Sequence, residues 1–242
     1  MESTAGFYGK FPEVGDFVNR RLPKSFVEPW DGWLQSAIAS SQTQLGEEWL
    51  KMYLTSPLWR FVISKGLCGD SPWFGLMMPS VDRVGRYFPL TLACRLPLDA
   101  NPLKVVLEGS DWFDMAEEAL MSVLVDTRFN MENFDTRVVS LGSLDKAHAS
   151  IGTPINVGFG SVWQISLSEQ GVNSAIPTLA HQLLLQRLSD YSLWWGSGSD
   201  FVSSSLLVCA GLPQVKDFSA MLSGDWSSGN WEQWSMPLPD NI

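Results

Sequence analysis

The chain has 242 residues, of which 45% are hydrophobic and only 17% are charged, with 12 Trp and 13 Phe. This composition indicates a sizeable core, in one large domain or two small ones, and excludes wholesale disorder. The net charge of −10 is uneven, since residues 1–110 hold 11 basic and 11 acidic groups and residues 111–242 hold 5 basic and 15 acidic. No continuous basic face results, which argues against a nucleic-acid partner.

The start of the chain, MESTAGFYGK, lacks a charged segment followed by an apolar run, and no window approaches eighteen consecutive apolar residues. We therefore expect no signal peptide, no membrane span and a cytoplasmic location. The three cysteines, Cys68, Cys94 and Cys209, are far apart and form no Cys-x-x-Cys pair. Because Cys94 and Cys209 lie in apolar runs, buried reduced thiols are favoured over disulfides or metal ligands.

Residues 6–34 combine turn residues, aromatic side chains and charges in one short stretch, GFYGKFPEVGDFVNRRLPKSFVEPWDGWL. Turns are expected at Gly9, Pro12 and Gly15, because glycine admits positive φ and proline fixes φ near the turn value. The aromatic residues would anchor this loop on a core, and they are Phe7, Tyr8, Phe11 and Phe17. The charged residues would pair or face solvent, and they are Lys10, Asp16, Arg20 and Arg21. An ordered crossing with a solvated polar face and a partner-binding surface remain as alternatives.

A helix is predicted next, ended by the polar run 40–44 and Gly46, and a short second helix follows before Pro57. The first of these helices begins either with a Ser25/Glu28 capping box or with Pro29 at the first helical position. The apolar positions of the first helix recur at helical spacing, at Trp30, Trp33, Leu34, Ala37 and Ile38. The inward positions of the second helix would be Trp49, Leu50, Tyr53 and Leu54.

Three consecutive strands are predicted at residues 58–64, 73–78 and 90–96, which implies an antiparallel meander. The link between the last two reads PSVDRVGRYFPL and places Arg83 and Arg86 among turn residues at one end of the sheet. Such loops often carry binding residues. The alternative is a structural ion pair from Asp82 to Arg86, with Tyr87 and Phe88 plugging the end of the sheet.

The following helix would be capped by Ser110 or Asp111, with an apolar stripe at Phe113, Ala116, Leu120, Val123 and Leu124. Its carboxylates, Asp111, Asp114, Glu117 and Glu118, are interpreted as a solvated face that suits the helix dipole. The pattern is weak over residues 126–157, where residues 137–141 form a candidate strand and residues 127–157 a candidate subdomain junction.

Strand character returns at residues 162–167, a helix is predicted at 178–188, and a hairpin joins 191–195 to 201–209 through Gly-Ser-Gly-Ser. Residues 223–242 are expected to be an irregular tail whose Trp226, Trp231 and Trp234 lie on the body. We therefore predict an α+β fold, a single domain over residues 1–222. Its antiparallel sheet would be built from the β-rich blocks 58–96 and 160–209 and covered by helices, in a longin-like or a TBP-like arrangement.

No catalytic pattern is visible in the sequence. His148 and His181 are far apart, Gly9-Lys10 lacks the rest of a phosphate-binding loop, and no Gly-x-Ser-x-Gly elbow is present. Residues 158–160 lack the third glycine of a dinucleotide fingerprint. We expect no enzyme activity, no metal and no cofactor, and His181 is interpreted as a helix residue with a satisfied side chain.

Residues 6–34 and 79–90, and more loosely SLWWGSGS at 192–199, resemble the TagF (ImpM) family of type VI secretion accessory proteins. The resemblance implies a post-translational negative regulator that binds and sequesters a cytoplasmic component, the scaffold with a forkhead-associated domain. A structural subunit of the apparatus and an unrecognised enzyme are the alternatives. The residues assigned to the signature loops are Gly9, Lys10, Pro12, Gly15, Asp16, Phe17, Arg20, Arg21, Asp82, Arg83, Gly85, Arg86, Phe88 and Pro89.

One spatial prediction follows from the placing of the two loops. Both are rich in Gly and Pro, both carry Arg beside an Asp, and both border elements of the first half of the chain. We expect them to meet at one end of the sheet, with Asp16 or Asp82 paired to an Arg of the other loop.

Overall fold

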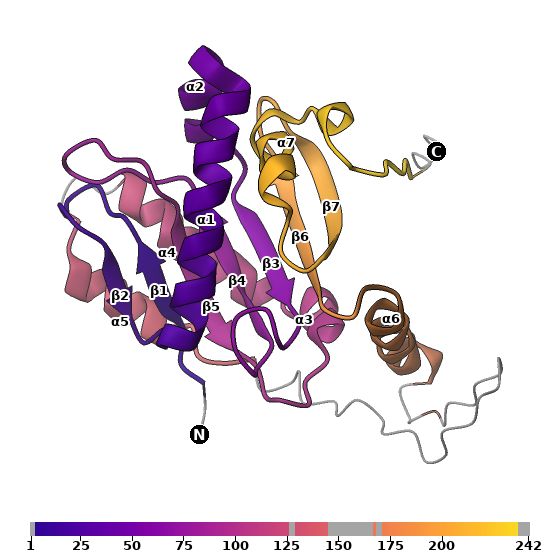
Figure 1. Ribbon diagram of the computed structural model, residues 1–242. Coiled ribbons are helices and arrows are strands. Elements are labelled where there is room, and N and C mark those ends of the chain that lie inside the picture. Colours follow the sequence, from indigo (N-terminus) through magenta and orange to yellow (C-terminus); the bar gives the residue numbers. More distant parts are fainter. Residues whose placement is uncertain (1–2, 126–128, 145–166, 168–170, 237–242) are drawn as a thin grey trace, which may run out of the picture.

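One seven-stranded antiparallel sheet organises the protein, in the order β2-β1-β5-β4-β3-β6-β7 (Figure 1). The computed structural model describes residues 3–125, 129–144, 167 and 171–236. Helices cover both faces of the sheet and enclose two hydrophobic cores. The α+β class predicted from the sequence is confirmed.

The predicted meander is present as β3 (Trp59–Ile63), β4 (Trp73–Met78) and β5 (Leu90–Arg95). The alternating positions of β5 divide between the cores, with Leu92 and Cys94 in one and Ala93 in the other. Thr91 is buried as well, and its hydroxyl accepts a hydrogen bond of 2.9 Å from the Trp30 indole N–H. β5 is therefore buried on both faces, and the hydroxyl of Thr91 is satisfied there.

Two strands that the sequence did not reveal lie in the N-terminal stretch, β1 (Gly6–Gly9) and β2 (Val18–Arg20). They form a hairpin, and β1 pairs with β5. Gly9 has φ +142°, and a Cβ at this position would lie 2.2 Å from the Pro89 carbonyl oxygen. A glycine is therefore required here by the close approach of β1 to the start of β5.

One face of the sheet is covered by α1 (Lys24–Leu45), followed by the 3₁₀ turn Gly46–Glu48 and α2 (Trp49–Leu54). Neither predicted start of α1 is correct: the amides of Phe26 and Val27 bond to the Pro23 carbonyl, no side chain caps the helix, and Pro29 lies inside it. Along α2, Trp49 and Tyr53 are buried as predicted, whereas Leu50 and Leu54 are exposed. The apolar face of this one-and-a-half-turn helix is thus narrower than expected.

The opposite face carries α3 (Pro102–Glu108), which the sequence did not predict, α4 (Ser110–Val125) and α5 (Met131–Ser140). A strand was expected where the second half of α5 lies. The helix forms because the Asn130 side chain accepts from the amides of Glu132 and Asn133, and because Phe134 and Val138 reach the core at helical spacing.

The acidic face of α4 is not wholly solvated, contrary to the sequence interpretation. Asp114 Oδ1 lies 2.6 Å from Arg60 Nη2, and Glu117 Oε1 lies 2.7 Å from Arg60 Nε. Leu124, expected in the apolar stripe of this helix, is exposed. The charged side of α4 therefore turns partly toward β3, which carries Arg60.

The C-terminal block joins the same sheet. It consists of α6 (Val172–Leu188), β6 (Tyr191–Gly198), β7 (Ser203–Ala210), the 3₁₀ turn Val215–Asp217, α7 (Phe218–Ser223) and the 3₁₀ turn Trp226–Ser228. The predicted hairpin is confirmed, and β6 pairs with β3. Trp226 and Trp231 pack on the core, but Trp234 is exposed, contrary to expectation. The strand predicted at 162–167 and His148 fall outside the described residues, apart from Leu167.

A clamped pair of loops as the candidate binding surface

The loop that follows β1, residues 10–17 (the first loop), and the loop between β4 and β5, residues 79–89 (the second loop), lie against each other. The Ser80 hydroxyl donates to the Lys10 carbonyl at 2.7 Å, and the Arg83 amide donates to the Val14 carbonyl at 3.1 Å. The Arg86 guanidinium donates to the Gly15 carbonyl. The predicted meeting of the two loops is confirmed.

A buried ion pair joins the loops, and its basic partner is a lysine where an arginine was expected. Lys10 Nζ lies 2.6 Å from Asp82 Oδ2, and the two side chains are 4% and 0% exposed. Asp16 forms no ion pair with any described residue, and its Oδ1 accepts the Phe17 amide at 2.8 Å. Because Lys10 and Asp82 are both buried, neither side chain can contact a partner protein.

The Asp82 carboxylate receives four hydrogen bonds. Its Oδ1 accepts the amides of Val84 and Arg86, and its Oδ2 accepts the Lys10 ammonium and the Arg86 Nε at 2.7 Å. Burial opposes ionisation, but the Lys10 ammonium and the donors of Arg86 and Val84 hold the pKa of Asp82 well below its usual range. The structural Asp82–Arg86 pair that the sequence left open is therefore present. It fixes the second loop together with the turn at Gly85, where φ is +85°.

A buried tyrosine of α2, Tyr53, holds the second loop through the backbone of Ser80. The Tyr53 hydroxyl donates to the Ser80 carbonyl at 2.9 Å and accepts the Ser80 amide at 3.0 Å, and burial raises the pKa of this phenol. Tyr53 was predicted as an inward residue of this helix, but its contact with Ser80 was not, since nothing in the helical spacing separates a core tyrosine from one that holds a loop.

Aromatic rings close the space between the loops. The Phe17 ring stacks on Tyr8 at 5.5 Å, meets Phe88 edge-on at 4.8 Å, and has its centroid 4.3 Å from Lys10 Nζ. Phe88 and Pro89 are buried, so they plug the sheet end, as one sequence interpretation expected of Phe88. Phe17 remains 39% exposed. A single aromatic face is thus presented to solvent beside the clamped backbone.

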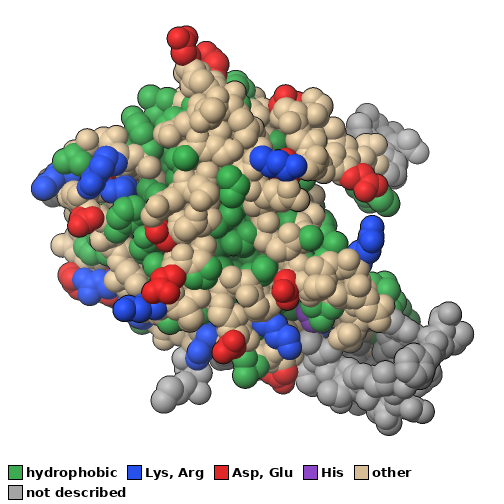
Figure 2. Space-filling model, in the orientation of Figure 1, with side chains coloured by type: hydrophobic (Ala, Val, Ile, Leu, Met, Phe, Trp, Pro, Cys, Tyr) green, Lys and Arg blue, Asp and Glu red, His purple; other side chains and the backbone are tan. Residues whose placement is uncertain are grey.

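The exposed side chains of the two loops are called the loop rim, which consists of Glu13, Asp16, Phe17, Arg83, Val84 and Arg86. The Val84 side chain is 64% exposed, and the Arg83 guanidinium lies over Gly15, with no ion pair to any described residue. Figure 2 shows basic side chains gathered at the edge of the molecule where these loops lie. The rim therefore offers an aromatic ring, an aliphatic side chain and a free arginine on a rigid support.

Arg20 and Arg21, assigned to the same surface from the sequence, lie elsewhere. Arg21 Nη2 is 2.6 Å from Asp135 Oδ1 of α5, and Arg21 Nε donates to the Ala5 carbonyl at 2.7 Å. Arg20 reaches Glu132 of the same helix at 3.6 Å. β2 leads from the first loop toward α5, so its last residue, Arg20, and the next residue, Arg21, both lie beside that helix. Closeness in sequence to the first loop therefore does not place these arginines on its surface.

Other chemistry-bearing residues are accounted for. His181 is buried, and its Nδ1 lies 2.6 Å from the Tyr191 hydroxyl, so its ring is satisfied as predicted. Burial lowers the pKa of His181. The three cysteines are buried and form no disulfide with one another. Within the described part of the chain, no group of three or more His, Cys, Asp or Glu could hold a metal ion. None of the described helices combines the length and apolar character that crossing a bilayer requires.

Fold and site together define an antiparallel α+β protein whose N-terminal hairpin is locked by a buried ion pair to the loop between β4 and β5. The family profile "TagF N-terminal domain, type VI secretion system-associated" matches residues 6–141, which run from β1 through α5 and contain both loops. The chain belongs to this family of type VI secretion system-associated proteins.

A solved structure resembles the whole chain. The crystal structure of PA0076 from Pseudomonas aeruginosa PAO1 is 38% identical, covers 99% of this chain and 100% of its own, and superposes with a TM-score of 0.77. The similarity therefore extends past residue 141 to β6, β7 and α7, which lie outside the family profile. A search of the curated proteins gave no match.

Proposed function

We propose that this protein is a cytoplasmic, non-enzymatic negative regulator of type VI secretion that acts after translation by binding and sequestering a component of the apparatus. The scaffold protein with a forkhead-associated domain is the proposed target. Family membership supports the link to secretion. The observation that supports a binding role is the loop rim, where Arg83, Val84 and Phe17 project from a clamped backbone.

The chemistry of the rim suits a protein partner. Aromatic and arginine side chains carry much of the binding energy in protein interfaces, and aliphatic contacts around them exclude water. A rigid support lowers the ordering cost of binding, and here Asp82 holds the second loop through Lys10 and Arg86. The exposed charges of the second loop are basic, whereas Glu13 and Asp16 of the first loop are acidic. We propose that the partner presents an acidic group to Arg83.

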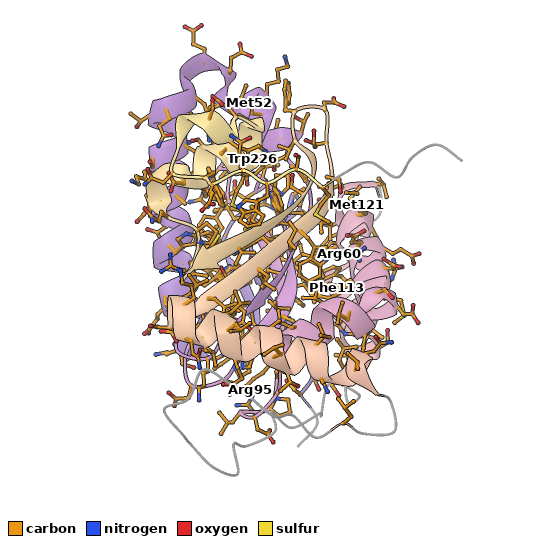
Figure 3. All side chains as sticks on the ribbon, turned by 90° about the vertical axis from the view of Figure 1, so that its right-hand side faces the viewer. Met52, Arg60, Arg95, Phe113, Met121 and Trp226 are labelled. Atoms are coloured by element: carbon orange, nitrogen blue, oxygen red, sulfur yellow. The ribbon has the colours of Figure 1, made fainter. Side chains whose placement is uncertain are left out.

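The direct test is charge reversal at the rim. Arg83→Glu should weaken binding of the purified scaffold by about tenfold or more, since a central interface arginine contributes roughly 2 kcal/mol. The matched control is Arg95→Glu, an exposed arginine at the end of β5 that lies far from the rim. Figure 3 shows Arg95 at the end of the molecule opposite Met52, whose neighbour Tyr53 contacts the second loop. Scaffold binding is measured by calorimetry, and secretion by the amount of secreted protein in culture medium.

Opposite outcomes separate the proposal from its rivals. Deleting the gene should raise secretion if the protein represses the apparatus, whereas deletion of a structural subunit abolishes secretion. Arg83→Glu should raise secretion as the deletion does, and Arg95→Glu should not. If both variants remain folded and repress like the wild type, the loop rim is not the binding surface.

A further inference from the structure

The two edges of the sheet differ in how they are protected. At one edge, β7 is eight residues long, SSSLLVCA, with no charged residue and no proline. Its register with β6 stays constant from Tyr191↔Ala210 to Gly198↔Ser203, so no bulge twists the strand away. Native proteins block such edges with charges, prolines, bulges or short strands, because unpaired backbone groups recruit further strands. β7 has none of these devices.

The edge of β7 is also open. Apart from the Ser205 hydroxyl, which donates to the Ser203 carbonyl at 2.8 Å, no described group outside β6 bonds to the backbone of residues 203–210. Leu207 and Cys209 point into the core beside α7, and the alternate residues Leu206 and Val208 point to the other face, where they are 61% and 48% exposed. In Figure 3 the ribbon of β7 crosses the front of the molecule with no helix over it.

The opposite edge is blunted. β2 has only three residues, and the basic residues that end it are tied to α5, Arg20 to Glu132 and Arg21 to Asp135. A further strand added there would meet charged side chains and a helix. As far as the described residues go, each chain therefore carries one open edge, and an assembly through that edge closes once two copies have joined.

We propose that β7 pairs antiparallel with β7 of a second copy and joins two seven-stranded sheets into one symmetric dimer. A second copy fits this edge because the strand is uncharged within a chain of net charge −10, so that no like charges face each other when two copies align. A two-fold axis perpendicular to the sheet at Leu207 sets Leu206 of each copy opposite Val208 of the other. The four exposed apolar side chains then form one continuous stripe.

The proposed interface is small. It buries two strand edges and the Leu206–Val208 stripe, which is less than the roughly 1,200–2,000 Å² typical of stable complexes. We therefore expect a dimer that forms at high micromolar concentration and dissociates on dilution.

The test is sedimentation velocity of the full chain from low to high micromolar concentration. The wild type should shift from monomer to dimer. Leu206→Lys should remain monomeric throughout, because the substitution places lysines beside the two-fold axis. Leu107→Lys, at a 66% exposed position on α3, is the matched control and should dimerise like the wild type. A monomeric wild type, or equal dimerisation of both variants, overturns the proposal.

A second measurement does not depend on a variant. Amide hydrogen exchange of residues 203–210 should slow as the wild-type concentration rises, because the outward amides gain partners. Exchange that is independent of concentration overturns the dimer. Protection that appears only when another protein is added overturns it too, and assigns the edge to that protein.

Discussion

Two of the ion pairs that tie the N-terminal stretch to the rest of the protein differ in burial. Lys10 and Asp82 are almost inaccessible and their charged atoms are 2.6 Å apart. Arg20 and Glu132 are 3.6 Å apart and their side chains are 46% and 79% exposed. Both basic residues come from the same signature stretch. Residue type therefore does not separate the charges that hold the fold from those at the surface, whereas burial does.

This difference decides which charges can serve binding. The Lys10 ammonium is committed to Asp82, and Arg86 shares that carboxylate while its other donor holds Gly15. Among the signature residues of the second loop, Arg83 has an exposed guanidinium without an ion pair to the described residues. The clamp thus leaves one arginine available and fixes the backbone that carries it.

The largest effect is expected from breaking the buried pair. Lys10→Met should lower the free energy of unfolding by about 1–3 kcal/mol, because the buried Asp82 carboxylate loses the hydrogen bond from one charged donor and keeps Arg86 as its remaining ionic partner. Urea unfolding at pH 7, followed by tryptophan fluorescence, measures the change. A loss below about 1 kcal/mol, the value typical of exposed pairs, would show that solvent reaches the carboxylate when the lysine is removed.

A pH dependence should distinguish the buried carboxylate from its exposed neighbour. The pKa of Asp82 is depressed in the folded protein, so its contribution to stability is complete above the unfolded pKa, near 3.8, and is lost as pH falls below that value. The stability difference between wild type and Asp82→Asn should therefore shrink from pH 7 to pH 2. Urea midpoints across this range measure it.

The control for this pH series is Asp16→Asn, in the exposed part of the first loop. This variant controls for the loss of one negative charge from the loops. If the Asp82→Asn difference stays constant with pH, the network around that carboxylate does not favour its ionised form.

The central strands could be predicted from the sequence because each is a run of apolar residues with turn-forming residues on both sides. Pro57 and the turn cluster after Gly66 bound β3, and residues 73–78 and 90–95 follow the predicted limits. By contrast, β1 and β2 have four and three residues, too few for a period of two to show. They exist because β5 offers a partner along one edge, which is a tertiary effect.

At the candidate site, the sequence predicted that the loops meet but not which charges pair. The choice among Lys10, Arg20 and Arg21 depends on strand direction, since β2 carries the arginines to α5 and leaves the lysine beside Asp82. The direction of β2 cannot be inferred from a sequence that reads as a loop over residues 6–23. The contact of Tyr53 with Ser80 could not be found for a related reason: it joins residues 27 positions apart.

The smallest effect is expected at the exposed pair. Arg20→Gln should change the free energy of unfolding by less than about 1 kcal/mol, because water screens both charges and fixing two long side chains costs entropy. A double-mutant cycle with Glu132→Gln, measured by urea unfolding at low and high salt, gives the coupling directly. We expect a coupling below about 1 kcal/mol that falls further as salt is raised. A coupling of about 2 kcal/mol or more would show that Arg20, like Lys10, is a structural residue.

Since Arg20 lies away from the loop rim, a protein with Arg20→Gln should also repress secretion like the wild type. Loss of repression with the fold intact would extend the binding surface to β2.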